Sequence, residues 1–174
     1  MNIKIERAEI SQEFQLQSLY EKVADVPNGI IRYKNEINKD YVSGFLRNSI
    51  RNGLILVGLY DDIIVGEIHA QTPDIYAFQH ILTDLTIVVD PNFHGQGIGK
   101  RLFESFLRIV KKEYKHILRI ELFVREHNER TVKFYESLGF INEGRQEFKI
   151  FCSKSVFETP LHMAWFNPCY ERTT

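Results

Sequence analysis

Two kinds of hydrophobic pattern follow one another along the chain. Strand-like runs, which alternate apolar and polar residues or are rich in β-branched and aromatic ones, occupy 3–8, 54–60, 63–70, 81–89, 117–124, 140–151 and 156–166. Apolar residues at three- and four-residue spacing predict helices over 11–24, 38–52, 98–114 and 128–138. The resulting order, β-α-α-β-β-β-α-β-α-β-β, predicts a mixed α/β sheet with antiparallel members.

Short turn signals separate these elements. Pro27-Asn28-Gly29 breaks the chain between the first two helices, and Asp61-Asp62 between two β-rich runs reads as a tight hairpin. Asp90-Pro91 stops the strand before it, and Gly139 is suited to a left-handed cap at the end of the last helix. No repeat, low-complexity tract or linker divides the chain, so we expect one domain over 1–174.

Composition narrows the class of protein. The chain has 174 residues, of which 44% are hydrophobic and 13% aromatic, which is enough for a packed core. The formal net charge of −1 argues against binding to nucleic acid, which needs an excess of Lys and Arg to meet phosphates.

Cysteine usage and the start of the chain bear on location. Cys152 and Cys169 lack the spacing of a zinc site, so we expect reduced thiols and no metal. No apolar run approaches the roughly 20 residues that span a bilayer. The alternating start, 1–7, differs from a signal peptide. We therefore expect a cytoplasmic protein with no membrane partner, either a monomer or a homodimer.

A glycine-rich turn between a strand and a long helix is the most informative segment. Gly95, Gly97 and Gly99 stand at alternate positions, where they let the backbone turn tightly and approach a ligand. The unpaired N–H groups at the helix start form an anion site. Lys100 and Arg101 in the first turn would oppose the helix dipole unless a phosphate were bound there.

Other glycine motifs fit less well. A Walker P-loop needs Gly-Lys-Ser/Thr, but Lys100 is followed by Arg. A dinucleotide fingerprint needs GxGxxG and an acid about 20 residues later, whereas the spacing here is GxGxG. A purely structural turn is a further alternative.

The segment from Pro91 to Gly99 resembles the acyl-CoA pyrophosphate loop of the GNAT superfamily of N-acetyltransferases, whose pattern is Arg/Gln-x-x-Gly-x-Gly/Ala. His94 departs from this pattern, because Arg or Gln is usual there. The resemblance implies acetyl-CoA as co-substrate and a mixed, mostly antiparallel sheet that is splayed at the cofactor cleft and flanked by helices. The residues it assigns to cofactor binding are Ile87, Val88, Val89, His94, Gly95, Gln96, Gly97, Ile98, Gly99, Lys100, Asn128 and Tyr135.

A second signature lies downstream. A strand leads to Asn128 and then to a helix that contains Tyr135 and ends in Gly139-Phe140, which is similar to the family's Tyr-x-x-x-Gly-Phe. Asn128 and Tyr135 are seven residues apart and therefore share a helix face. The resemblance implies that Tyr135 protonates the departing CoA thiolate. The alternatives are that Asn128 only caps its helix and that Tyr135 only packs in the core.

Acetyl transfer to an amine needs further groups. An ammonium titrates near 10, so a base must remove its proton before attack on the thioester. The thioester oxygen becomes negatively charged during the attack and needs a hydrogen-bond donor, and the resemblance assigns this role to the backbone N–H of Val89.

Several residues are candidates for the general base. Glu67 and Glu121 lie on strands that flank the expected cleft, and either one could instead pair with a cation. Strand alternation turns Asp84 away from the face that carries the assigned oxyanion donor. His69 and His80 are further candidates, although a lone His is more often structural.

The acceptor is not encoded in a recognisable motif. The last strands are similar to those of amino-acid and other small-amine N-acetyltransferases, which favours a small primary amine such as an amino acid or polyamine. We expect the N-terminal helices and the 71–80 loop to select it. Acetylation of a protein N-terminus or lysine, and a non-catalytic CoA-binding regulator, remain as alternatives.

Overall fold

The computed structural model describes residues 2–153 and 155–172. The strands are β1 (Lys4–Arg7), β2 (Gly53–Tyr60), β3 (Ile63–Gln71), β4 (Ile81–Val89), β5 (Arg119–Arg125), β6 (Ile141–Arg145), β7 (Ile150–Ser153), β8 (Val156–Glu158) and β9 (Pro160–Phe166). The α-helices are α1 (Glu13–Ala24), α2 (Lys39–Asn52), α3 (Ile98–Glu113) and α4 (Glu129–Ser137). The predicted order of helices and strands is confirmed as far as β6.

The main sheet has the order β1-β2-β3-β4-β5-β9-β6, and its neighbouring strands are antiparallel except for β4 and β5. Those two parallel strands pair only at Ile81–Arg119 and Leu82–Ile120. Beyond these pairs β4 stays bonded to β3, and β5 stays bonded to β9. The sheet is therefore split along its middle, which confirms the predicted mixed, mostly antiparallel and splayed sheet.

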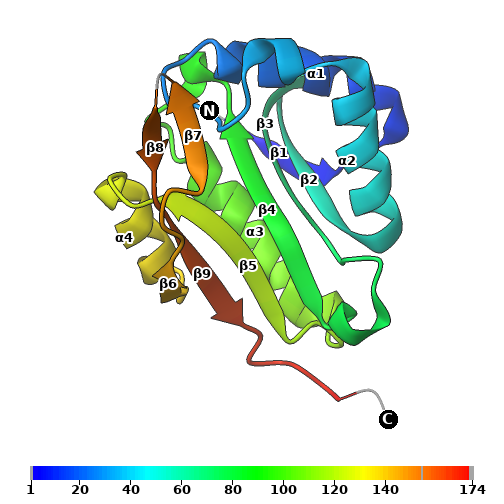
Figure 1. Cartoon of the computed structure of the whole chain (residues 1–174). Coiled ribbons are helices and arrows are strands. Elements are labelled where there is room, and N and C mark those ends of the chain that lie inside the picture. Colours follow the sequence, from blue (N-terminus) through cyan, green and yellow to red (C-terminus); the bar gives the residue numbers. More distant parts are fainter. Residues whose placement is uncertain (1, 154, 173–174) are drawn as a thin grey trace.

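Helices cover both faces of the sheet (Figure 1). The amphipathic helix α3 buries Leu102, Phe103 and Phe106 against one face, where the side chains of α4 join the same core. On the opposite face α1 and α2 bury Leu16, Leu46 and their neighbours against β2 and β3. Burial of these apolar faces, at about 25 cal/mol per Å², is the main term that holds the layers together.

The C-terminal part differs from its prediction. The sequence predicts two long strands, but 140–151 and 156–166 are divided into β6, β7, β8 and β9, and β7 pairs only with β8. The break between β6 and β7 is a turn in which Phe148 has a left-handed backbone (φ 57°). Figure 1 shows the resulting β7–β8 hairpin standing apart from the main sheet beside the α1–α2 connection.

The predicted turns are present. Asp61 and Asp62 both have positive φ, at 48° and 62°, as the tight hairpin between β2 and β3 requires. Gly139 has φ 92° directly after α4, which confirms the left-handed cap. Among the described residues, none of the helices has the length and apolar character needed to cross a membrane.

Candidate active site

A cavity of about 790 Å³ lies where β4 and β5 separate. Its walls come from the loop between α1 and α2, from α2, from the end of β3, from the splayed edges of β4 and β5, and from α4 with its N-cap. The lining residues are Asn28, Gly29, Ile30, Ile31, Arg32, Glu36, Tyr41, Phe45, His69, Gln71, Asp84, Leu85, Thr86, Ile87, Phe123, Val124, Arg125, Asn128, Thr131 and Tyr135. The gap in the sheet thus opens into a space that both helical layers border.

The glycine turn leads from this gap into α3. Gly95 and Gly97 have φ 76° and 74°, a left-handed conformation that glycine adopts without strain, and Gly97 is the N-cap of α3. A Cβ added to either residue would meet no atom within 4 Å. The turn therefore leaves open space in front of the unpaired N–H groups of the helix start, which suits a phosphate group.

The side chains around the turn take parts that the sequence does not reveal. The ring of His94 contacts the carbonyl of Val89 through Nε2 at 3.0 Å, so it ties the turn to the end of β4. Arg101 donates to the carbonyl of Ile3 at 2.8 Å and is therefore engaged away from the turn. Lys100 is exposed and pairs loosely with Glu104 at 3.8 Å, which leaves its ammonium available near the helix start.

Backbone amides of β4 face the gap. The amide of Asp90 donates to Val65 on β3 at 2.9 Å. Because amides alternate in direction along an antiparallel strand, those of Ile87 and Val89 point away from β3, toward β5. The sheet offers them no partner there, since β4 and β5 pair only at the other end of β4.

Asp90 anchors the turn to the N-terminal helices. Its carboxylate is 2% exposed, accepts from the amide of Asn92 at 2.9 Å, and pairs with the Lys22 ammonium of α1 at 2.8 Å. Burial alone would raise the pKa of Asp90, but the hydrogen bonds from Lys22 and Asn92 outweigh it and lower the pKa. Asp90 is therefore a charged structural group at neutral pH.

Tyr135 borders the cavity from α4. Its ring packs against Phe103, Phe134 and Phe140, with centroids 5.5 to 5.8 Å away. Burial raises the pKa of Tyr135 to about 12, so the phenol is protonated at neutral pH. Within the described part of the chain its hydroxyl has no hydrogen-bond partner, which leaves the proton available on the cavity side.

Asn128 does cap its helix. Its Oδ1 accepts from the amide of Thr131 at 3.2 Å, as the capping interpretation predicts. Asn128 and Thr131 also line the cavity, so capping and a position at the candidate site coexist.

Glu67 and His69 form a buried pair on β3. Glu67 is fully buried and His69 is 3% exposed, and His69 Nδ1 lies 3.0 Å from Glu67 Oε1. The hydroxyl of Tyr20 donates to the other oxygen of Glu67 at 2.6 Å. Burial and the nearby charge of Glu67 raise the pKa of Tyr20 well above its usual value, so Tyr20 stays a donor.

The pair fixes the tautomer of the histidine. A carboxylate only accepts, so Nδ1 of His69 donates to Glu67, and in the neutral imidazole Nε2 is then the nitrogen with the lone pair. No described residue hydrogen-bonds to Nε2. The ring stacks on Phe45, with centroids 4.4 Å apart, and lines the cavity opposite Thr86 of β4. His69 therefore borders the cavity with Glu67 behind it, which makes its imidazole a candidate general base.

Glu121 and His80 lie elsewhere. The carboxylate of Glu121 pairs with Arg119 at 2.8 Å, near the closed end of the gap, and Glu121 is not among the cavity-lining residues. His80 precedes β4, and its carbonyl accepts from the amide of Leu118 at 2.8 Å. Neither residue is brought to the cavity.

The alternation argument for Asp84 is wrong. Between His69 and Gln71 of β3 the partner shifts from Thr86 to Thr83, so β4 holds an extra residue there. Asp84 has φ 55°, lines the cavity and accepts from the Gln71 amide at 3.1 Å. A bulge of this kind changes the face on which a side chain lies, and alternation then fails.

The described residues form no group of three or more His, Cys, Asp or Glu side chains placed to hold a metal ion. The groups that the site does present are an open space at a helix start, strand amides that face the gap, a buried histidine whose Nε2 meets no described residue, and a protonated phenol. Together they suit binding of an extended thioester and transfer of protons around it.

Comparisons with known proteins agree with this geometry. Residues 16–140 match the family model described as the Acetyltransferase (GNAT) family. The chain belongs to this family, as the two sequence signatures predict. A curated relative, the histone acetyltransferase TAP1 of Glycine max, is 31% identical over 127 residues, which cover 73% of this chain and 51% of the relative.

Solved structures share the fold. The GNAT-family acetyltransferase of Streptococcus pneumoniae has a TM-score of 0.80 at 21% identity, and the match covers 95% of this chain and 99% of that one. The yncA protein of Salmonella typhimurium, whose structure contains acetyl-CoA, has a TM-score of 0.83 at 14% identity, covering 100% and 98%. The chain spans about half or less of the length of the first curated relatives that it matches.

Proposed function

We propose that the protein is an N-acetyltransferase that moves the acetyl group of acetyl-CoA to the primary amine of a small molecule. The observation that carries the proposal is the single cavity that joins the gap in the sheet to His69 on one side and Tyr135 on the other. The membership of the chain in the GNAT family and the acetyl-CoA in a structural neighbour support it.

The residues present fit acetyl-CoA. The amides of the Gly95–Gly99 turn, with Lys100 nearby, would hold the pyrophosphate in the open space before α3. The amides of Ile87 and Val89 would pair with the pantetheine arm as a neighbouring strand does. Ile87 borders the cavity and Val89 does not, so we assign the donor to the thioester oxygen to Ile87 rather than to Val89.

His69 supplies the base in this proposal. Its Nε2 accepts a proton from the substrate ammonium, and the neutral nitrogen then attacks the thioester carbonyl carbon. Glu67 acts through His69: it accepts from Nδ1–H, fixes the tautomer and stabilises the imidazolium that forms. The Ile87 amide donates to the oxygen on which negative charge develops.

Tyr135 completes the proton balance. As the carbon–nitrogen bond forms and the carbon–sulfur bond breaks, the sulfur leaves with the electron pair and takes the phenol proton. The phenolate of Tyr135 then takes the second proton of the nitrogen, and the imidazolium of His69 releases its proton to solvent, so both side chains return to their starting states. The products are the N-acetyl amine, free CoA thiol and one proton released overall.

A protein acceptor is the second candidate. The relative from Glycine max is named as a histone acetyltransferase, which favours it. A small-molecule acceptor is supported by the segments that border the cavity. The α1–α2 loop contributes several residues to the cavity wall, and the β7–β8 hairpin lies against that loop through a hydrogen bond from Tyr33 to the Cys152 carbonyl. These segments narrow the access to the cavity, which favours a small acceptor over a protein.

A panel of primary amines, with acetyl-CoA and a free-thiol readout, tests the proposal. We expect thiol release with at least one small amine, lowered about 10²–10⁴-fold by His69→Gln, and lowered less by Glu67→Gln. Peptides with free N-termini and with lysine belong in the same panel. Binding of acetyl-CoA without thiol release from any amine or peptide would identify a non-catalytic CoA-binding protein.

A further inference from the structure

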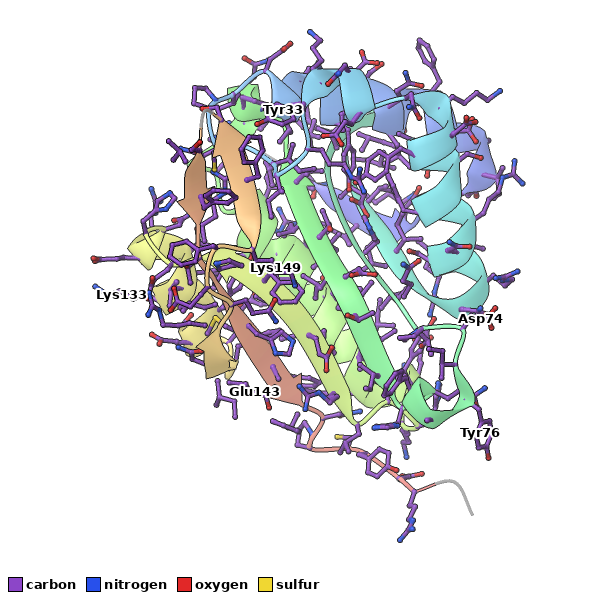
Figure 2. The ribbon with its side chains drawn as sticks, viewed as in Figure 1. Tyr33, Asp74, Tyr76, Lys133, Glu143 and Lys149 are labelled. Carbon is purple, nitrogen blue, oxygen red and sulfur yellow. The ribbon has the colours of Figure 1, made fainter. Side chains whose placement is uncertain are left out.

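Two cations each rest on an aromatic ring that lines the cavity, and Arg32 is itself a lining residue. The guanidinium carbon of Arg32, in the α1–α2 loop, lies 4.1 Å from the centroid of Tyr41. The ammonium of Lys149, just before β7, lies 3.7 Å from the centroid of Phe123. Both contacts are within the range of a cation–π interaction. Figure 2 labels Lys149, which lies in front of β5 and not at the outer edge of the molecule.

Neither cation has a close acidic partner. The nearest carboxylate to Arg32 is Glu36 at 3.9 Å, the outer limit of an ion pair, and both side chains are about 45% exposed. Lys149 forms no ion pair with any described residue. Arg125, which also lines the cavity, differs because it is engaged by Asn28 at 2.5 Å and Glu158 at 3.2 Å.

A continuous wall joins Arg32 to the proposed base. Tyr41 packs on Phe45 at 5.3 Å, and Phe45 stacks on His69 at 4.4 Å. One side of a small molecule can therefore contact Arg32 and His69 across an apolar surface. Gln71, two residues after His69 on β3, donates to the carboxylate of Asp84 on β4.

Carboxylates therefore lie on the His69 side of the cavity, where Glu67 contacts His69 and Asp84 contacts Gln71, and Arg32 lies at the other end of the aromatic wall. We propose that the acceptor is an α-amino acid with an apolar side chain, whose carboxylate is bound by Arg32 and Lys149 while its ammonium faces His69. A guanidinium keeps planar N–H donors that match a carboxylate even when its face rests on a ring. A polyamine fits poorly, because its second ammonium would meet both cations.

This inference rests on the proposed function, and matched substrates test it. Leucine, methionine and phenylalanine are each compared with the corresponding carboxamide, which removes the negative charge and keeps the side chain. We expect kcat/KM to favour the acid. Arg32→Gln and Lys149→Gln should each lower kcat/KM for the acids by roughly 10- to 100-fold, the range of one lost charge-assisted hydrogen bond. In the same variants, kcat/KM for the carboxamide substrates should change less than about threefold.

Lys112→Gln is the matched control, because Lys112 is an exposed lysine near the end of α3 that is distant from the helix start. This substitution should leave kcat/KM for the acids and for the carboxamides unchanged. Equal kcat/KM for the acid and the carboxamide in the wild-type protein overturns the inference. An equal fall in kcat/KM for both substrates in Arg32→Gln overturns it as well. If a peptide with an acidic second residue gives a higher kcat/KM than every free amino acid, the carboxylate that the two cations bind belongs to a peptide, and the proposal of a free amino acid is wrong.

A binding experiment separates failure of the inference from failure of the proposed function. With CoA present, calorimetry compares N-acetyl-leucine with N-acetyl-leucinamide. Binding at least tenfold tighter for the acid, lost in the Arg32→Gln/Lys149→Gln double variant, upholds the anion site even if no amine is acetylated. Equal binding of the two compounds, or binding of neither, overturns it.

Discussion

Tyr135 combines a buried ring with a hydroxyl that no described residue engages, and burial raises its pKa to about 12. We expect Tyr135→Phe to lower kcat about 10²–10⁴-fold, because it removes the proton given to the leaving sulfur and keeps the ring packing. KM for acetyl-CoA should change little, since the lost interaction is made mainly in the transition state. Steady-state kinetics checks this, with circular dichroism as the control for folding. A loss below about threefold would leave Tyr135 as a packing residue.

At the scale of single residues, the sequence identifies the cavity-lining residues of α4 more readily than those of β3 and the α1–α2 loop. Tyr135 and Asn128 stand in a recognisable order after a strand, and both border the cavity. His69 is ranked low from sequence because one histidine on a strand has many structural uses. The signal available was its spacing: Glu67 and His69 are two residues apart, so they share a face of β3.

The other missed residues depend on tertiary structure. Asp84 lines the cavity only because β4 contains an extra residue, which no periodicity reveals. Arg32 belongs to an irregular loop whose path is fixed by contacts with distant segments, among them the Asn28–Arg125 hydrogen bond. Local propensity carries no information about such contacts.

At the scale of elements, the glycine turn and α3 form one unit. Gly97→Asp places a side chain and a negative charge in the open space before the helix. We expect the Kd for CoA to rise well over tenfold, or about 1.4 kcal/mol and more, because the anion site is blocked and its charge opposed. Calorimetry measures the change. Gly144→Asp, on β6, is the matched control, since Gly144 also has a positive φ (152°) and a Cβ there also meets nothing within 4 Å; equal CoA binding by the two variants would place the phosphate elsewhere.

The strand end before that turn is held to α1 by Asp90 and Lys22. Asp90→Asn keeps an acceptor for the Asn92 amide but removes the charge, so we expect unfolding free energy to fall by about 1 kcal/mol at pH 7. The pKa of Asp90 is lowered in the folded state, so its contribution is present above the unfolded value of about 3.9 and is lost as pH falls through the lower folded pKa.

Urea unfolding of wild type and Asp90→Asn between pH 7 and pH 3 checks this. The difference in unfolding free energy should be constant near neutral pH and shrink below about pH 4. A difference that persists undiminished to the lowest pH would assign the effect to packing rather than to the charge.

The C-terminal elements show where prediction of the fold stops. Periodicity identifies 140–151 as strand-forming, yet it does not say which sheet a strand joins. The β7–β8 hairpin exposes Phe148, Phe151 and Phe157, so the apolar residues that suggest a continuous core strand lie at the surface. Pairing between distant strands, such as β9 between β5 and β6, is decided by tertiary contacts rather than by local pattern.

At the scale of the whole molecule, acetyl-CoA should act as a cross-link between the two halves of the split sheet. Its proposed contacts come from β4 and the α3 turn on one side and from α4 on the other. A ligand that binds only the folded state stabilises it by RT ln(1 + [L]/Kd), about 2.7 kcal/mol at a hundredfold excess over Kd. For a chain of this length that corresponds to a rise in Tm of roughly 5–11 °C.

Thermal unfolding with acetyl-CoA, CoA, ATP and NADH measures this stabilisation. We expect acetyl-CoA to raise Tm most and CoA somewhat less, because both contain the pyrophosphate and the pantetheine arm that would fill the gap between β4 and β5. ATP and NADH lack that arm, so they can meet the glycine turn alone and should shift Tm much less. Gly97→Asp should reduce the shift with acetyl-CoA to about half or less, because a tenfold higher Kd leaves about 1.4 of the 2.7 kcal/mol, whereas Tyr135→Phe should retain it, since the phenol proton is not needed for binding. An equal shift with ATP would show that the turn binds nucleotides without using the gap, and the proposed path of the acyl arm between β4 and β5 would be wrong.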